Sequence, residues 1–321
     1  MKPQFSNQVV SSAYLWLDHL LCDDGAAFYN LNSNLYNITN RYSNFYTYAL
    51  PYNSIISDTS VPSSYGVSGV YVNNNYTPVG SGGLFAINFN AGQAYFTTQP
   101  AGTVSGNFSV KEFNIRLTNK PEETIIFETK HFLRPKTLMG YTGLNNEISY
   151  PVIYIKESSS NNRPFSMGGE DITTSNLRLL VFADSQFNLD AVNSLIRDQT
   201  FSYIPLITEA EMPFNSLGYY KSGAIYNYDN LSTNKVTNGS GLFIEDIYIS
   251  KFNQNSYSSE MKTLNPEVFM GVIDIEVNYP RFVRTYTYPS GTSISISEFT
   301  RTMEDGDYRI TEEGDTRITE D

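Results

Sequence analysis

Residues 177–183 read Leu-Arg-Leu-Leu-Val-Phe-Ala, and a helical pattern follows them at 188–198. Apart from Arg178, the first run is apolar throughout, which is typical of a strand buried on both faces of its sheet. In the second segment apolar residues recur at helical spacing, which predicts an amphipathic helix capped by Ser185 or Asn188. Short strands are predicted on either side of this pair, at 150–155 and 201–207. A strand–helix–strand unit attached to further β-structure predicts an α+β fold with mixed β-sheets.

The amino-terminal part of the chain begins with a second helical pattern, at 7–22. Its apolar residues again recur at three- and four-residue steps, which predicts a helix docked by one apolar stripe. Alternating and apolar runs predict the remaining β-structure. A hairpin is expected from 84–89 and 94–96 around an Asn90-Ala91-Gly92 turn, and further strands are expected at 104–117, 123–133, 242–250, 269–277 and 281–288.

Two polar regions, 26–82 and 208–268, are dominated by Tyr, Asn and Ser and show weak periodicity. We expect long, irregular surface loops, with a few short strands in the first region and a strand near 242–250 in the second, inserted into an α+β domain that spans 1–297. Loops of this length usually carry function or an interaction surface, and exposed aromatic rings favour protein contacts. The alternative for each tyrosine is an ordinary half-buried strand residue. The candidate interface residues are Tyr46, Tyr48 and Tyr71 in the first region and Tyr219, Tyr220 and Tyr226 in the second.

The carboxyl terminus carries an internal repeat. Residues 306–313 read GDYRITEE, residues 314–321 read GDTRITED, and residues 298–305 fit the same frame more weakly. The repeat predicts a separate tail at 298–321, in which short Arg-Ile-Thr strands alternate with tight turns. One interpretation is a solvated, frayed terminus. The other is a β-ribbon that lies on a neighbouring subunit, with Arg309 and Arg317 contacting acidic surfaces there.

The charge balance and the single cysteine disfavour several classes of protein. The chain has 21 Lys and Arg against 33 Asp and Glu, a formal net charge of −12. This disfavours a general nucleic-acid binder, which needs a basic face. Cys22 is the only cysteine, so no intramolecular disulfide can form. The sequence has no signal-peptide pattern and no apolar run long enough to span a membrane, so we expect assembly in a reducing cytoplasm.

The sequence offers little that resembles catalytic chemistry. Of its two histidines, His19 lies three residues before Cys22, which is a weak metal-ligand pattern, and His131 has no such neighbour. Nucleophile-elbow, P-loop, dinucleotide and EF-hand patterns are absent from the sequence. We therefore expect no catalytic residues, no cofactor and no bound metal, and a protein that is not an enzyme. A pair of glycosidase carboxylates far apart in the sequence stays open.

Three stretches together carry a family resemblance: the 150–196 unit with Arg163-Pro164-Phe165-Ser166-Met167-Gly168-Gly169-Glu170 in its loop, the hairpin segments of 84–120, and the GDxRITED ending. In the order strand, turn, long strand, helix, the first resembles the neck, tail-terminator and tail-completion (head–tail adaptor) proteins of tailed bacteriophages. The helix at 7–22 matches their amino-terminal helix. Members of that family are often much shorter, so 26–82 and 208–268 are expected to be insertions.

The resemblance implies a non-enzymatic structural subunit of a phage virion, assembled in the host cytoplasm. Such subunits form closed homo-oligomeric rings at the head–tail junction, and their other partners are portal or connector, tail tube and sheath proteins. DNA would pass through the ring without sequence-specific binding, which an acidic lumen favours, and no membrane is involved.

Two alternatives remain. One is a virion-attached adhesion or decoration module that binds host glycan through its tyrosine-rich loops. The other, ranked last, is a β-rich glycoside hydrolase that uses two carboxylates.

Overall fold

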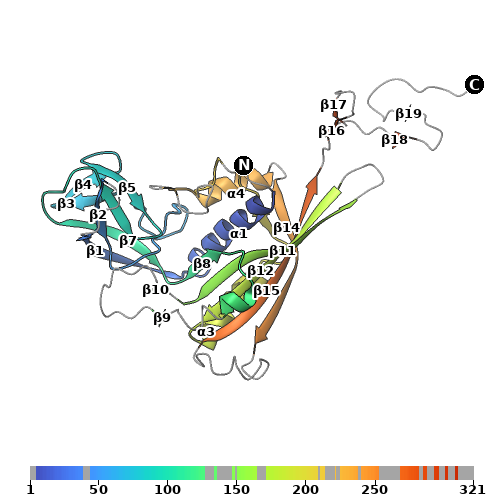
Figure 1. The fold of residues 1–321 in the computed structure, drawn as a ribbon, viewed down its shortest axis with the longest axis horizontal. Coiled ribbons are helices and arrows are strands. Elements are labelled where there is room, and N and C mark those ends of the chain that lie inside the picture. The colour runs from blue at the N-terminus through green and yellow to red at the C-terminus, as the bar shows by residue number, and fades with distance from the viewer. Residues whose placement is uncertain are drawn as a thin grey trace, which may run out of the picture.

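The computed structural model describes residues 5–38, 44–126, 150–164, 171–208, 210–213, 221, 225–237, 240–252 and 268–281, and the backbone of short strands at 134–135, 147–148, 285–287, 293–295, 301–302 and 308–309. The fold is α+β, as predicted. Figure 1 shows helix α1 (Phe5–Cys22) between two β-sheets, one built from the amino-terminal part of the chain and one from later segments.

The first sheet has seven strands in the order β4-β3-β7-β1-β2-β6-β5, and its paired strands are antiparallel. The predicted hairpin is confirmed as β5 and β6. Gly92 in its turn has φ +63°, and a Cβ there would lie 2.1 Å from the Tyr52 carbonyl oxygen, so glycine is required. The strands are β1 (Phe28–Ile38), β2 (Tyr46–Ala49), β3 (Gly69–Val72), β4 (Asn75–Pro78), β5 (Leu84–Asn88), β6 (Gln93–Phe96) and β7 (Val104–Lys111).

The few short strands expected in 26–82 are present as β2, β3 and β4, of four residues each, but the expectation of an otherwise irregular region is wrong for β1. The longest of them, β1, has 11 residues, of which Leu35 alone is fully buried. β7 pairs with 28–35 and β2 pairs with 36–38, so backbone hydrogen bonds to its neighbours hold this strand. Its inward positions are only partly apolar, so the sequence carries no clear alternation of apolar and polar residues.

The second sheet has six strands in the order β13-β14-β15-β12-β11-β8, and it is mixed, as predicted, because β8 runs parallel to β11 while its other pairs are antiparallel. The predicted run 104–117 is split at Glu112-Phe113, so that β7 belongs to the first sheet and β8 to the second. The strands are β8 (Asn114–Leu117), β11 (Val152–Pro164), β12 (Asp171–Ala183), β13 (Tyr203–Pro205), β14 (Gly241–Phe252) and β15 (Phe269–Arg281).

The predicted break at Asn278-Tyr279-Pro280 is also wrong, because β15 runs through it. Phe243 of β14 pairs with Asn278, and beyond that point β15 pairs with β12 alone. Pro280 lies in this one-sided stretch, where its missing N–H removes little from the ladder. The predicted strand at 123–133 is wrong for 123–126, which belong to a helical turn at 122–126, and residues 127–133 lie outside the described part.

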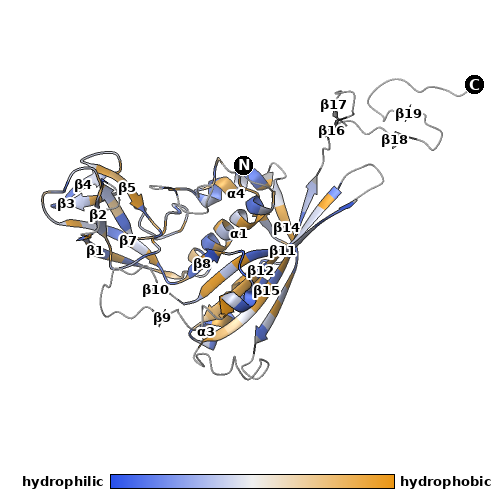
Figure 2. Ribbon diagram, viewed as in Figure 1, coloured by the Kyte–Doolittle hydropathy of each residue, from blue (hydrophilic) through white to orange (hydrophobic). Residues whose placement is uncertain are grey.

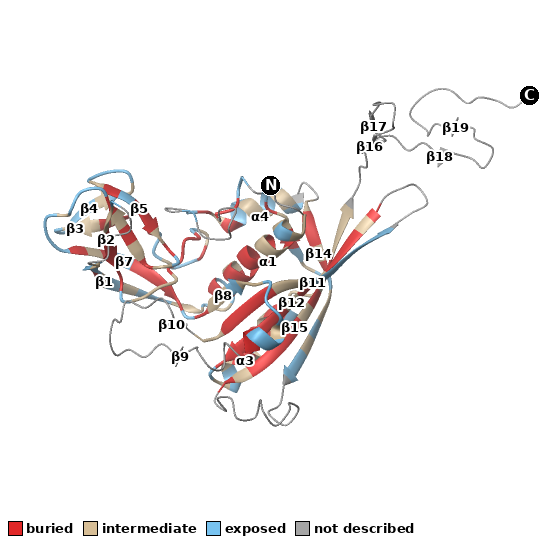
Figure 3. Cartoon of the chain, in the orientation of Figure 1, coloured by how far each residue is buried: buried red, intermediate tan, exposed pale blue. Residues whose placement is uncertain are grey.

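The helices α1, α3 (Gln186–Arg197) and α4 (Tyr228–Thr237), together with the helical turn at 122–126, complete the described part of the fold. Both predicted helices are confirmed, and Ser185 is the N-cap of α3, accepting a hydrogen bond from the Asn188 N–H at 3.2 Å. α1 and α3 cover one face of the second sheet, where buried apolar residues gather (Figures 2 and 3). α4 lies inside the region 208–268, where the sequence predicted loops.

Other short pairs lie further along the chain: β9 (Arg134–Pro135) with β10 (Glu147–Ile148), β16 (Thr285–Thr287) with β17 (Ser293–Ser295), and β18 (Arg301–Thr302) with β19 (Tyr308–Arg309). The last pair falls within the predicted tail, and the rest of that tail lies outside the described residues. The division into 1–297 and 298–321 stays a prediction.

Candidate functional site

A buried ion pair joins α1 to the end of β7. The Lys111 Nζ lies 2.6 Å from each carboxylate oxygen of Asp18, and the two residues are 5% and 2% exposed. The Tyr226 hydroxyl also donates to Asp18 Oδ2, at 3.2 Å. Burial by itself lowers the pKa of Lys111, but the charge and hydrogen bonds of Asp18 outweigh it and raise that pKa. Lys111 therefore stays a charged ammonium group and is not available as a nucleophile or base.

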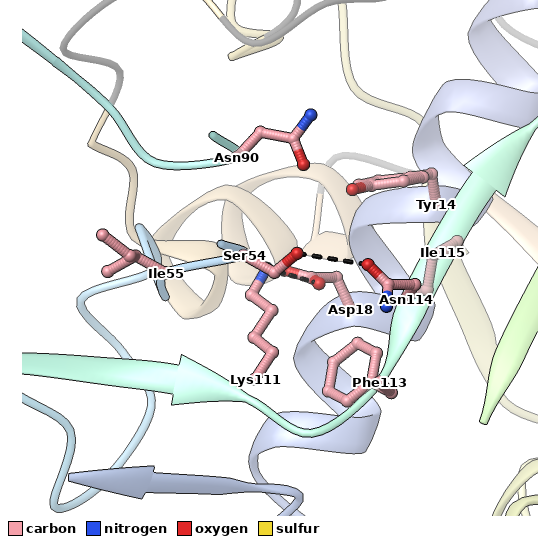
Figure 4. A pocket seen from close by; sticks show the side chains of 9 residues that line it. All are labelled: Tyr14, Asp18, Ser54, Ile55, Asn90, Lys111, Phe113, Asn114 and Ile115. Atoms are coloured by element: carbon pink, nitrogen blue, oxygen red, sulfur yellow. Dashed lines mark hydrogen bonds and ion pairs between the residues drawn. The ribbon is translucent and has the colours of Figure 1, made fainter. Parts of the chain in front are cut away.

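A small cavity of about 20 Å³ adjoins this pair, with room for about one water molecule. Figure 4 shows its lining, in which the Ser54 hydroxyl donates to Asn114 Oδ1 at 3.2 Å near the Lys111–Asp18 pair. The cavity's size suits a buried solvent molecule that hydrogen-bonds polar side chains rather than a metabolite.

The next residue of α1, His19, faces three carboxylates. Its Nδ1 lies 2.8 Å from Asp58 Oδ2, and its Nε2 lies 3.5 Å from Asp229 and 3.8 Å from Asp23. The ring stacks on Tyr228, with centroids 4.4 Å apart. Burial lowers the pKa of His19, but the hydrogen bond and charge of Asp58, aided by the other two carboxylates, outweigh it, so the pKa is raised above 6.5.

Asp58 is held by three further hydrogen bonds. Its Oδ1 accepts from the Ser60 N–H at 3.0 Å, the Ser60 hydroxyl at 2.6 Å and the Tyr228 N–H at 3.1 Å. Burial raises the pKa of Asp58, while these donors and His19 lower it by more, so that the carboxylate stays ionised well into acidic pH.

These contacts form one joint, which we call the α1 polar joint: Asp18, His19, Asp58, Lys111, Tyr226 and Tyr228. It connects α1, the end of β7, the segment after β2 and the start of α4. Backbone hydrogen bonds reinforce it, because Thr59 N donates to Tyr226 O at 2.8 Å and Tyr226 N donates to Ser57 O at 3.2 Å. These buried ion pairs and hydrogen bonds hold the first sheet against the helix that packs on the second sheet.

The weak metal-ligand pattern of His19 and Cys22 does not form a metal site in the described structure. In the described segments, no group of three or more His, Cys, Asp and Glu is arranged to hold an ion. Cys22 is buried, and burial raises the pKa of its thiol, so the sulfur stays protonated. His131 lies outside the described residues.

The predicted interface tyrosines have different surroundings. Tyr48 is buried in the first sheet's core with its ring 5.5 Å from Phe96, and Tyr226 is buried in the α1 polar joint, so both serve the chain's own packing. Tyr46 and Tyr71 are half-buried, and Tyr71 packs edge-on against Tyr76. Tyr219, Tyr220 and Arg317 lie outside the described residues, and Arg309 is described in backbone only, in β19.

Sequence reasoning missed two exposed aromatic clusters. The first, which we call the β5 surface, contains Phe45, Phe85 and Tyr95; Phe85 is 55% exposed and stacks on Phe45 at 4.8 Å. The second, the β13 surface, contains Phe201, Tyr203 and Phe243; Phe201 is 69% and Tyr203 50% exposed. No local sequence signal marked these clusters, because each combines residues from separate segments at an edge strand of its sheet.

None of the helices in the described segments combines the length and the apolar character that crossing a bilayer would require. No protein-family model matches this sequence, and no curated protein is significantly similar to it.

Proposed function

We propose that this chain is a non-enzymatic structural subunit of a tailed-phage virion, which assembles into a closed ring at the head–tail junction. In this role it would act as a neck, adaptor or tail-terminator protein and contact other copies of itself and portal, tube or sheath proteins. The family resemblance of the sequence motivates the virion setting. Two features of the folded chain support the role of a ring subunit.

The observation that carries the proposal is the pair of aromatic surfaces on different sheets. A closed ring of identical subunits needs two different contact faces, since each copy binds its neighbour head to tail. Aromatic residues are enriched in the cores of such interfaces. The β5 surface and the β13 surface meet this requirement, one at the edge of each sheet.

The second feature is the α1 polar joint. A ring closes only if every subunit holds its two contact faces at the same angle. Charged groups that are buried and paired restrict movement between the elements they join. Lys111 on the first sheet and Asp18 on the helix of the second sheet provide such a restraint.

The test uses two variants of the full chain, Phe85→Ser and Phe201→Ser, with native mass from light scattering and particle shape from negative-stain microscopy. We expect wild type to form rings of one size and each variant alone to be monomeric. An equimolar mixture should give dimers, because one intact β5 surface and one intact β13 surface remain. Tyr65→Ser, at an exposed residue of neither surface, is the matched control and should keep the ring.

A wild-type chain that stays monomeric at all accessible concentrations, with and without virion partners, overturns the proposal. Variants that both keep the wild-type ring show that the aromatic surfaces are not its interfaces.

A specific observation favours the adhesion module as a second candidate. In the β5 surface, the Tyr95 hydroxyl donates to Gln93 Oε1 at 3.0 Å and accepts from Asn88 Nδ2 at 3.4 Å. Aromatic rings beside oriented amides are suited to stacking on a sugar ring and hydrogen-bonding its hydroxyls. A glycan array separates the two functions: binding that Phe85→Ser abolishes and Phe201→Ser preserves supports adhesion, and an array without hits counts against it.

A further inference from the structure

The outer edge of β11 is open over half its length. β12 pairs with β11 from Val152 to Pro164, which lies opposite Asp171, with a register shift between Glu157 and Ser159. On the other side β8 pairs with 152–155 alone, and the Thr118 N–H makes a last hydrogen bond to Ile155 O at 3.1 Å. Over 158–163, no strand in the described part of the chain takes up this side, and all six residues are exposed. An unpaired strand edge is a template for a strand from another chain.

The residues of this open edge are held in an extended conformation that suits pairing with another strand. Its residues are Ser158, Ser159, Ser160, Asn161, Asn162 and Arg163. On the side facing β12, hydrogen bonds hold it extended: Thr173 Oγ1 donates to Asn162 Oδ1 at 2.7 Å, Asn176 Nδ2 donates to Ser159 Oγ at 2.8 Å, and the Ser160 and Ser175 hydroxyls lie 3.1 Å apart. Natural edges usually carry proline, lysine or a bulge that blocks pairing. Residues 158–162 contain no proline or lysine, and the one register shift between β11 and β12 lies between Glu157 and Ser159, so the pairing from Ser159 to Pro164 is regular.

The chain's own carboxyl-terminal segment starts at the same end of this sheet, separated from β11 by β12. β15 ends at Arg281, which pairs with Asp171, the residue opposite Pro164 of β11. Residues 282–321 follow, and at roughly 3.3 Å per residue an extended segment of this length reaches on the order of 130 Å. That is far enough to reach a neighbouring copy.

The described residues of the repeat region, 301–302 and 308–309, form a short β-pair. β18 and β19 pair antiparallel, with Arg301 opposite Arg309, the equivalent positions of two successive repeats. Each full repeat keeps an Ile-Thr pair after its arginine, and both residue types favour strands.

The charges of the two segments are opposite. Residues 298–321 contain nine acidic residues and three arginines. The segment from β8 to Lys120, together with β11, contains Arg116, Lys120, Lys156 and Arg163 against Glu157. Glu122 neutralises Lys156 at 2.8 Å, which leaves Arg163 as the exposed cation at the open edge itself. Opposite charge favours encounter and orients the incoming strand.

We propose that the carboxyl-terminal repeats of one copy pair as β-strands with residues 158–163 of β11 in the next copy. This inference rests on the proposed ring and names the link between its successive subunits. When the tail of one copy is bound to its neighbour, the aromatic surfaces of the two copies are held close together. Their effective concentration rises, and the two contacts strengthen each other.

The test is disulfide crosslinking between full-length chains. The native Cys22 is buried, so it does not compete with introduced cysteines. One preparation carries Ser160→Cys, and a second carries Thr311→Cys or Thr319→Cys, which are equivalent positions of the two full repeats. After the two preparations are mixed and oxidised, we expect a crosslinked dimer on a non-reducing gel. Ser81→Cys, in an exposed turn of the first sheet, is the matched control and should give no crosslink.

A second pair of variants tests the strand itself. Ile310→Pro with Ile318→Pro should abolish the crosslink, because proline removes a ladder donor, while the corresponding valine variants should keep it. If the mixture gives no crosslink above that of the Ser81→Cys control, the inference is overturned. It is also overturned if a single chain that carries both Ser160→Cys and Thr311→Cys forms a disulfide only within itself and none with another copy. If rings form in the absence of the crosslink, this inference alone fails; if wild type never oligomerises, the proposed ring fails as well.

Discussion

Lys111 and Asp18 form a buried ion pair 93 residues apart in the sequence, in which one ammonium group contacts both carboxylate oxygens at 2.6 Å. Lys111 ends β7 of the first sheet, and Asp18 belongs to the helix that packs on the second sheet. The contact therefore couples the two halves of the fold. Its geometry allows the strength of that coupling to be measured.

Replacing Lys111 with Met should lower the free energy of unfolding by about 3–5 kcal/mol, because Asp18 then stays buried without a countercharge. The Tyr226 hydroxyl would be the one donor to Asp18 that remains from this cluster. Urea denaturation of wild type and variant, followed by tryptophan fluorescence of Trp16 in α1, measures the difference.

The control is the double variant Asp18→Leu with Lys111→Met, which removes both charges. It should recover most of the lost stability, since replacing a whole buried pair with apolar residues is often neutral or stabilising. A single Lys111→Met variant within about 1 kcal/mol of wild type, the range of an exposed pair, would contradict the buried geometry.

Tyr226→Phe should lower the free energy of unfolding by about 1.5–3 kcal/mol, the range of a hydrogen bond to a charged group. The phenyl ring keeps the packing of the buried tyrosine and removes the 3.2 Å bond to Asp18. The same urea titration measures the loss. In the Asp18→Leu background the substitution should cost much less, and an equal cost there would show that the hydroxyl acts through another partner.

The stability of the chain should depend on pH through His19. The pKa of His19 is raised above 6.5, so its contribution is fully present below pH 6.5 and is lost as pH rises through the folded pKa. The pKa of Asp58 is lowered from 3.8, so its contribution is present above pH 3.8 and is lost as pH falls through the lower folded value. The contacts of His19 with Asp58, Asp23 and Asp229 are therefore strongest at mildly acidic pH.

The measurement compares urea midpoints of wild type and His19→Gln below pH 6.5 and at alkaline pH. Wild type should be the more stable by the larger margin at the acidic pH, and the margin should shrink as pH rises. A margin that grows with pH would mean that His19 is held neutral by burial, against the direction inferred from its three carboxylates.

Local patterns predicted the parts of this fold that carry an apolar face. The stripes of α1 and α3, the run 177–183 and the hairpin around Gly92 all have periodicity that a short window reveals. β1 could not be found this way, because its polar side chains are mostly exposed and its neighbours supply its order. The Lys111–Asp18 pair and the two aromatic surfaces bring together residues from distant segments, and no local window contains such information.

Asn193→Leu should raise the free energy of unfolding by about 1–3 kcal/mol, because the asparagine amide is buried without a partner. Asn193 lies on α3, is 4% exposed, and neither of its side-chain polar atoms has a hydrogen bond in the described structure. The amide packs against Gly271 of β15, because a Cβ built on that glycine would lie within 3.7 Å of both amide atoms. Leucine has nearly the same size as asparagine, so its apolar side chain can take this place against the strand. Asn188→Leu is the matched control, because the Asn188 amide donates to Asp184 at 2.8 Å, and it should not stabilise the chain. Thermal unfolding of both variants settles the sign, and a lower melting temperature for Asn193→Leu would show that this amide is satisfied in solution by a buried water molecule.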